Sequence, residues 1–91
     1  MEIEFDPEKR VMTLAERGLD MARAVEIFDG DHLTIIDDRK DYGEERLMSF
    51  GFIDPRMVVI AWTRRGEVIR IISMRKANDR EQAKYNRQLG R

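Results

Sequence analysis

Carboxylates and cations stand side by side at two places in this chain where they could act on a phosphate group. Glu44 and Glu45 directly precede Arg46, and Arg75 directly precedes Lys76. A carboxylate can take the proton of an attacking hydroxyl, and arginine can bind the phosphoryl oxygens on which charge develops. Such a set could cleave RNA through its 2′-hydroxyl without a metal ion. The candidate catalytic residues are therefore Glu44, Arg46, Arg75 and Lys76, with Glu44 or Glu45 as the base.

Three further side chains near these motifs are candidates for RNA binding. Arg70 offers another guanidinium to the phosphate backbone. Regular strand alternation places Ser73 and Arg75 on one face with Ile71, so that Arg75 emerges from the core side at the end of the strand. Tyr42 could stack on a base, or it could pack beneath its own loop.

Each of the two catalytic motifs also has a purely structural interpretation. Arg46 shares strand parity with Met48 and lies at the edge of an apolar face, so its charge requires a partner. A substrate phosphate could be that partner, or Glu44 could brace the loop through an ion pair. The corner from Arg75 to Asn78 could bind an anion at a helix N-terminus, or it could be a solvated basic turn.

The charges of the chain are divided between its two halves. Residues 1–45 hold fourteen acidic and six basic side chains, whereas residues 46–91 hold four acidic and eleven basic ones. The formal net charge of −1 therefore conceals a basic second half, which favours a nucleic-acid partner. The acidic first half indicates a second, separate binding surface.

Composition excludes several other classes of protein. The 91 residues are enough for one domain, and the absence of cysteine rules out a disulfide framework, a thiolate metal site and a catalytic cysteine. His32 is the single histidine, so we expect no zinc site and no other cofactor. The N-terminus lacks the layout of a secretory signal, and no apolar run approaches the length of a membrane span. We therefore expect a soluble, cytoplasmic protein that makes no contact with a membrane.

Two helices are predicted near the N-terminus. Asp6 followed by Pro7 is a helix start, and Gly18 is placed to end that helix. Within it, Val11, Leu14 and Ala15 have the spacing of an amphipathic helix. A second helix begins after a cap at position 20, carries an apolar stripe through position 28 and ends at position 30.

An extended region and a final helix follow. Four segments rich in β-branched and aromatic residues predict strands, and short turns connect the last three into an antiparallel meander. Asn78 and Glu81 have capping-box spacing at the start of a C-terminal helix. The predicted fold is α+β, with a short N-terminal strand, two helices, a four-stranded antiparallel sheet and a C-terminal helix. The four strands are expected at 33–37, 46–53, 57–63 and 67–74.

Four motifs resemble, in order, those of the BrnT toxins of bacterial type II toxin–antitoxin systems. They are FDPEKR from Phe5, RG from Arg17, DDRKDYGEER from Asp37 and IRIISMRKA from Ile69. The resemblance implies a RelE-like fold, with residues 1–91 as a single toxin domain. It also implies a metal-independent endoribonuclease that inhibits translation and growth. A BrnA-type antitoxin would neutralise it in a hetero-oligomeric complex that binds operator DNA through the antitoxin.

The chain departs from the family pattern near its start. Thr13, Glu16-Arg17 and Met21 stand where an Asn, a Lys-His pair and an aromatic residue are common. Arginine cannot shuttle a proton near neutral pH, because its pKa is above about 12. The alternative function is therefore a catalytically degenerate module that only binds antitoxin or nucleic acid. A DNA-binding repressor is disfavoured, because no helix-turn-helix carries the basic residues.

Overall fold

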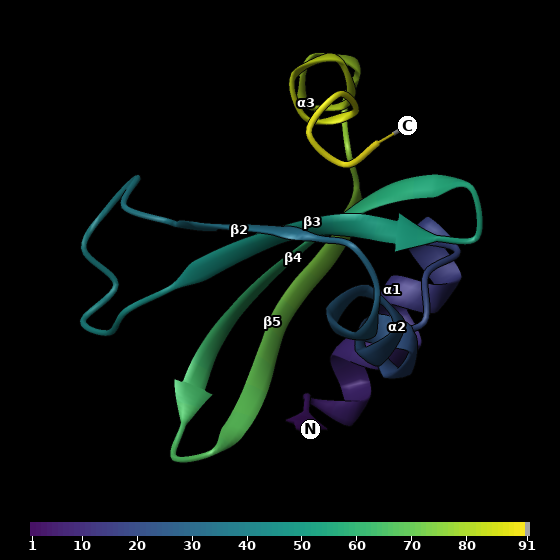
Figure 1. Ribbon diagram of the computed structural model, residues 1–91. Helices are drawn as coiled ribbons and strands as arrows, with labels where there is room; N and C mark the ends of the chain where they lie inside the picture. The colour runs from purple at the N-terminus through teal and green to yellow at the C-terminus, as the bar shows by residue number, and fades with distance from the viewer. Residues whose placement is uncertain (91) are drawn as a thin grey trace.

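A mixed β-sheet lies at the centre of the protein, and helices lie against both of its faces (Figure 1). The computed structural model describes residues 1–90. Its strands are β1 Glu2–Glu4, β2 Leu33–Ile36, β3 Leu47–Ile53, β4 Arg56–Arg65 and β5 Val68–Lys76. Its helices are α1 Pro7–Arg17, the 3-10 turn η1 Met21–Arg23, α2 Ala24–Asp29 and α3 Asp79–Tyr85. Across the sheet, the strand order is β1-β5-β4-β3-β2. Helices α1 and α2 lie together on one side of the sheet, and α3 lies on the other (Figure 1).

The α+β class is confirmed, and the predicted four-stranded antiparallel sheet is present but has a fifth strand that was not expected in it. Strands β2 to β5 form the expected antiparallel meander. The N-terminal strand β1 joins the same sheet as a fifth strand within the described residues, parallel to β5, with Glu2 opposite Val68. This pairing joins residues more than sixty positions apart, so no local pattern indicated it.

The helix boundaries follow the local signals in the sequence. The backbone N–H of Glu8 donates to Asp6 Oδ1 at 2.9 Å, and Gly18 ends α1 in the left-handed conformation with φ 69°. Asn78 and Glu81 form a complete capping box at the start of α3. The predicted second helix is instead divided into η1 and α2, with Asp20 capping the first part.

Each face of the sheet carries its own hydrophobic core. The core on the α1/α2 face contains Leu19, Met21, Ala24, Ile27, Phe28, Ile53, Val58, Ile60, Trp62, Ile69, Ile71 and Met74. The core on the α3 face contains Met48, Phe50, Met57, Val59, Ala77, Tyr85 and Leu89. A central sheet buried on both sides explains why the sequence of β4 is apolar at nearly every position from Met57 to Trp62.

A β-bulge in β5 changes which side chains share a face. Ala61 pairs with Ser73, whereas Trp62 pairs with Ile71, so Ile72 is an extra residue in its strand. Because of this extra residue, the alternation of side chains between the two faces of the sheet shifts by one position at Ile72. The expectation that Ile71 and Ser73 share a face is wrong, because Ile71 enters the α1/α2 core and Ser73 faces the opposite side.

Helix α1 lies along the part of β5 that β1 leaves uncovered. Strand β1 pairs only with the first three residues of β5, up to Arg70. Beyond them, Lys9 Nζ donates to the Ile72 carbonyl at 3.1 Å and Arg17 donates to the Met74 carbonyl at 2.8 Å. These cations satisfy backbone acceptors that an open sheet edge would leave unpaired. The polar side of α1 therefore faces the sheet.

Candidate active site

The α3 face of the sheet carries a group of arginines beyond the area that α3 covers. The backbone N–H of Asp37 donates to the carbonyl of Arg46 at 2.8 Å, and Thr63 pairs with Arg70. The Thr63 hydroxyl donates to the Glu45 carbonyl at 2.7 Å, which places Arg46 beside Thr63. Because residues directly opposite in a sheet point to the same side, these residues form one row across four strands.

Two further residues of β5 join this row on the α3 face. Ser73 pairs with Ala61, and Arg75 pairs with Val59, which belongs to the α3-face core. We call the surface formed by the following residues the arginine face: Arg39, Arg46, Thr63, Arg70, Ser73 and Arg75. The structure thus brings together four of the candidate residues, because the bulge at Ile72 turns Ser73 and Arg75 to the side of Arg70.

Arg46 lies against an aromatic ring and has no carboxylate partner. Its guanidinium carbon lies 4.0 Å from the centre of the Tyr42 ring, a favourable cation–π distance. Its Nε is buried and has no hydrogen-bond partner, and within residues 1–90 its side chain makes no ion pair. The ion pair with Glu44, one of the two alternatives for Arg46, is absent, because Glu44 forms no ion pair within residues 1–90. This half-buried cation therefore lacks the counter-charge that burial ordinarily requires, and a substrate anion could supply it.

Asp37 holds the loop that carries Tyr42 and Arg39. Arg39 donates to both Asp37 oxygens, at 2.7 and 2.9 Å, and the Tyr42 hydroxyl donates to Asp37 Oδ2 at 3.3 Å. The hydrogen bond from Arg39 is the main reason that the pKa of Asp37 lies below its usual value, although burial opposes the shift. Asp37 is therefore an ionised acceptor that positions its neighbours. Sequence analysis missed this role, although the Asp-x-Arg spacing of residues 37 and 39 was visible.

Arg75 is held at the start of α3 by an acidic residue. Its two terminal nitrogens donate to Glu81 Oε1 and Oε2 at 2.8 and 2.9 Å, and Glu81 Oε1 also accepts the Asn78 backbone N–H at 3.0 Å. The hydrogen bonds between them lower the pKa of Glu81 and raise the pKa of Arg75. The anion at the predicted Arg75–Asn78 corner is thus the protein's own carboxylate.

A groove joins the Asp37–Arg39 pair to the Arg75–Glu81 pair. It runs between α3 and β2 with the residues that follow β2, and Asp38, Arg80 and Lys84 line it as well. Four cations and three carboxylates therefore border the groove. Within residues 1–90, Arg80 and Lys84 form no ion pair, so they are the cations of this groove that a phosphate backbone could meet.

Comparison with known protein families identifies the family of this chain. A family model described as the ribonuclease toxin BrnT of type II toxin–antitoxin systems matches residues 5–81. The chain belongs to the BrnT family. No curated protein matches its sequence. The matched residues include every arginine of the arginine face, and family membership makes RNA the target and an antitoxin protein the partner.

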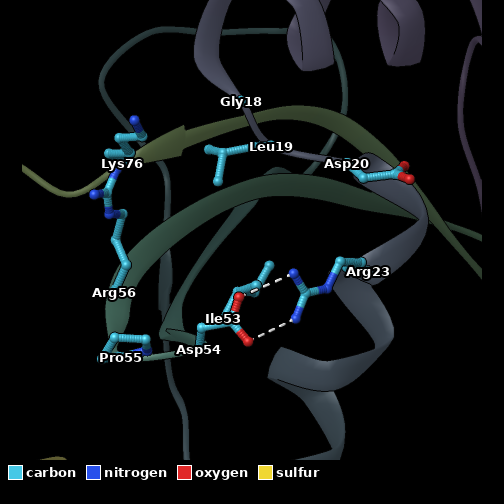
Figure 2. Close-up of a pocket in the computed structure, with 9 residues that line it drawn as sticks. All are labelled: Gly18, Leu19, Asp20, Arg23, Ile53, Asp54, Pro55, Arg56 and Lys76. Atoms are coloured by element: carbon cyan, nitrogen blue, oxygen red, sulfur yellow. Dashed lines mark hydrogen bonds and ion pairs between the residues drawn. The ribbon is translucent and has the colours of Figure 1, made fainter.

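In this BrnT toxin, Lys76 is separated from the other catalytic candidates. Lys76 pairs with Val58, which is buried in the α1/α2 core, so its side chain leaves the face of the sheet opposite to Arg75. Figure 2 shows Lys76 beside Arg56 at the wall of a pocket between the α1–η1 connection and the β3–β4 turn. In the same pocket, Arg23 binds Asp54.

Three other polar residues of this BrnT toxin, His32, Arg70 and Tyr85, contact neighbouring side chains of the fold. His32 packs edge-on against Phe28, with ring centres 5.7 Å apart, on the α1/α2 side. Arg70 has a long ion pair with Glu4 at 3.7 Å. Tyr85 docks α3 on the sheet through contact with the ring of Phe50, with ring centres 4.3 Å apart.

Residues 1–90 contain neither a cluster suited to a metal ion nor a helix that could span a membrane. Across this range, no group of three or more His, Asp or Glu side chains is arranged to hold a metal ion. None of the helices in the same range has the length and apolarity of a membrane span.

Proposed function

We propose that this BrnT toxin is a metal-independent endoribonuclease whose arginine face binds the RNA backbone. The observation that carries the proposal is the state of Arg46, a half-buried guanidinium with a free Nε and no carboxylate partner. Arg39 and Arg75 are bound to Asp37 and Glu81, so Arg46 is the cation best placed to meet a phosphate. Arg70 and Ser73 lie on the same face and extend the contact along the strand.

The proposed reaction is attack by the 2′-hydroxyl on the adjacent phosphorus. The O2′–P bond forms, the P–O5′ bond breaks, and the products are a 2′,3′-cyclic phosphate and a free 5′-hydroxyl. Arg46 stabilises the charge that develops on the phosphoryl oxygens. Glu44 takes the 2′-hydroxyl proton, because it is exposed, two residues from Arg46 and free of the arginine contacts that bind Asp37. The departing O5′ receives a proton.

The proposed biological context follows from the family. Cleavage of cellular RNA would stop translation and growth, and a BrnA-type antitoxin would neutralise the toxin by covering the arginine face. Operator DNA would be bound through the antitoxin. A basic surface that must be silenced explains why free toxin would require an antitoxin.

The deciding experiment uses purified, antitoxin-free toxin, total RNA and an excess of EDTA. Wild-type protein should cleave the RNA and leave cyclic phosphate ends, whereas a substrate with a 2′-deoxy nucleotide at the cleaved position should stay intact. Arg46→Ala should lower the rate by about a hundredfold, the cost of losing one charge-stabilising donor. Arg64→Ala is the matched control, because Arg64 also lies over an aromatic ring, that of Trp62, on the opposite face. Cleavage that requires an added divalent cation would contradict the proposal.

A second candidate function is a module that only binds its partners. The observation that favours it is Arg17, which stands where the family often has a Lys-His pair and donates to the Met74 carbonyl as a structural group. If expression of the wild-type toxin without antitoxin leaves growth and RNA unchanged, this function replaces the first.

A further inference from the structure

The apolar stripe of α1 faces solvent instead of the protein core. Val11 is 67% exposed and Leu14 is 49% exposed, and Ala15 beside them is exposed as well. Helix α1 contains no buried residue. An amphipathic helix ordinarily turns this stripe toward the core, so its exposure here indicates an unfilled interaction surface.

The orientation of α1 has a physical cause in the sheet that it borders. Lys9 and Arg17 donate to carbonyls of the β5 edge, and Arg10 is paired with Asp20 at 2.8 Å. These contacts fix the polar side of the helix inward. The apolar stripe is consequently held outward by the fold itself.

The charges that remain free on α1 are negative. Glu8 and Glu16 are exposed and make no hydrogen bond through their side chains or ion pair within residues 1–90, whereas the helix's cations are all engaged. Glu8 therefore borders the outward apolar stripe, whereas Glu16 lies beside Met12 at the pocket between α1 and β5. Both carboxylates would repel RNA and attract a protein partner that carries basic residues at its flanks.

We propose that this side of α1 is the docking surface for a helix of the antitoxin that has apolar residues on one side and Lys or Arg at its flanks. The proposal rests on the proposed function only in so far as the partner is the cognate antitoxin. An isologous pair of toxins would bring the acidic helix of one copy against that of the other, so like charges disfavour a second copy as the occupant.

The position of the stripe connects it with the arginine face. Met12, which is 56% exposed, lines a shallow pocket between α1 and β5 together with Ile72 and Ser73. Ser73 belongs to the arginine face. A chain that binds along α1 can therefore continue over Met12 to the RNA site, so that one partner both anchors on the helix and covers the arginines.

The test measures binding of the separately purified cognate BrnA-type antitoxin to the full-length toxin by calorimetry. Val11→Glu and Leu14→Glu should each weaken the affinity by about tenfold or more, since each places a charge in an apolar contact. Gln88→Glu is the control, because Gln88 is exposed beyond α3 and lines neither the groove of the candidate site nor the pocket beside α1. Glu16→Lys should weaken binding at low salt, with a smaller effect at high salt. Thermal midpoints should stay near that of wild type.

Three results would overturn the proposal. The first is unchanged affinity of the Val11 and Leu14 variants, and the second is an equal loss in Gln88→Glu. The third is a free wild-type dimer that Val11→Glu dissociates, since this would make a second copy the occupant. Cleavage of RNA by each free variant is measured separately. If the ribonuclease proposal is wrong, neither the wild type nor any variant will cleave RNA. The antitoxin affinities of the variants would still test the docking surface.

Discussion

The guanidinium of Arg46 lies over the ring of Tyr42, 4.0 Å from its centre, and this contact joins the β2–β3 loop to the arginine face. Lys40 approaches the same ring at 5.1 Å, and the Tyr42 hydroxyl donates to the buried Asp37. Because the ring is already in contact with cations, its main role in the free protein is to position Arg46. Through these contacts the loop holds Tyr42 beside Arg46, where it would support the proposed phosphate contact.

Substitutions of Tyr42 should distinguish the contribution of its ring to cleavage from that of its hydroxyl. Tyr42→Phe retains the cation–π contact, so cleavage should stay within about threefold of wild type, whereas Tyr42→Leu should lower kcat by about tenfold, a change of ~1.4 kcal/mol in the barrier. Single-turnover cleavage of a defined RNA provides the measurement. Equal activity of the Phe and Leu variants would show that the ring does not position Arg46.

Substitution of Arg75 and Lys76 should give different results although the two residues are adjacent. Arg75→Ala should lower the free energy of unfolding by about 1 kcal/mol, because Glu81 loses its partner at the start of α3, and it should also slow cleavage. Lys76→Ala should change stability and cleavage less, since Lys76 lies on the opposite face. Urea unfolding and cleavage rates test both statements. An equal loss of activity in Lys76→Ala would show that RNA contacts both faces of the sheet.

Acid should weaken the contact between Asp37 and Arg39. The pKa of Asp37 is lowered in the folded state, so the ionised form stabilises the fold. This contribution is complete above the ordinary aspartate pKa of about 4 and is lost as the pH falls through the lower folded pKa. Asp37→Asn should therefore reduce the free energy of unfolding by about 1–2 kcal/mol at pH 7 and by less near pH 3.

The comparison of wild type with Asp37→Asn is made by urea unfolding at several pH values. An asparagine side chain has nearly the same size as the native aspartate, so a change in packing contributes little. A difference that stays constant from pH 7 to pH 3 would show that the ionised state of Asp37 is not its cause.

Gly51 should not tolerate a side chain, because α2 packs directly on it. A Cβ atom at this position would lie 2.6 Å from Cγ2 of the buried Ile27. Gly51→Ala should therefore cost about 1–3 kcal/mol of stability through overpacking. Thermal or urea unfolding measures the effect. In the Ile27→Ala background the added methyl has space, so the double variant should be more stable than the sum of the single losses predicts. Strict additivity would contradict the contact.

The sequence predicted the features that depend on neighbouring residues. Asp6, Gly18, Asn78 and Glu81 fix helix ends through hydrogen bonds and backbone conformations that span only a few positions, and the structure contains each of them. The family followed from motifs in the same way, as the match to residues 5–81 confirms. The candidate residues Arg46, Arg70 and Arg75 were chosen by residue type, and their catalytic roles remain predictions.

Only the tertiary structure decided which of these residues meet. The bulge at Ile72 is a property of the pairing between β4 and β5, and it turns Ser73 and Arg75 to the face of Arg70, where strict alternation separates them. The addition of β1 to the sheet and the choice of Glu81 as the partner of Arg75 likewise depend on where separate elements come together.

The orientation of α1 shows most clearly what the sequence alone could not determine. The sequence alone determined that Val11 and Leu14 lie on one side of a helix, because helical periodicity fixes that. It did not determine which way this side faces, because the open carbonyls of Ile72 and Met74 draw Lys9 and Arg17 inward. Local spacing thus indicated most of the helices and strands and the family, whereas long-range hydrogen bonding decided which side chains lie on each face of the protein.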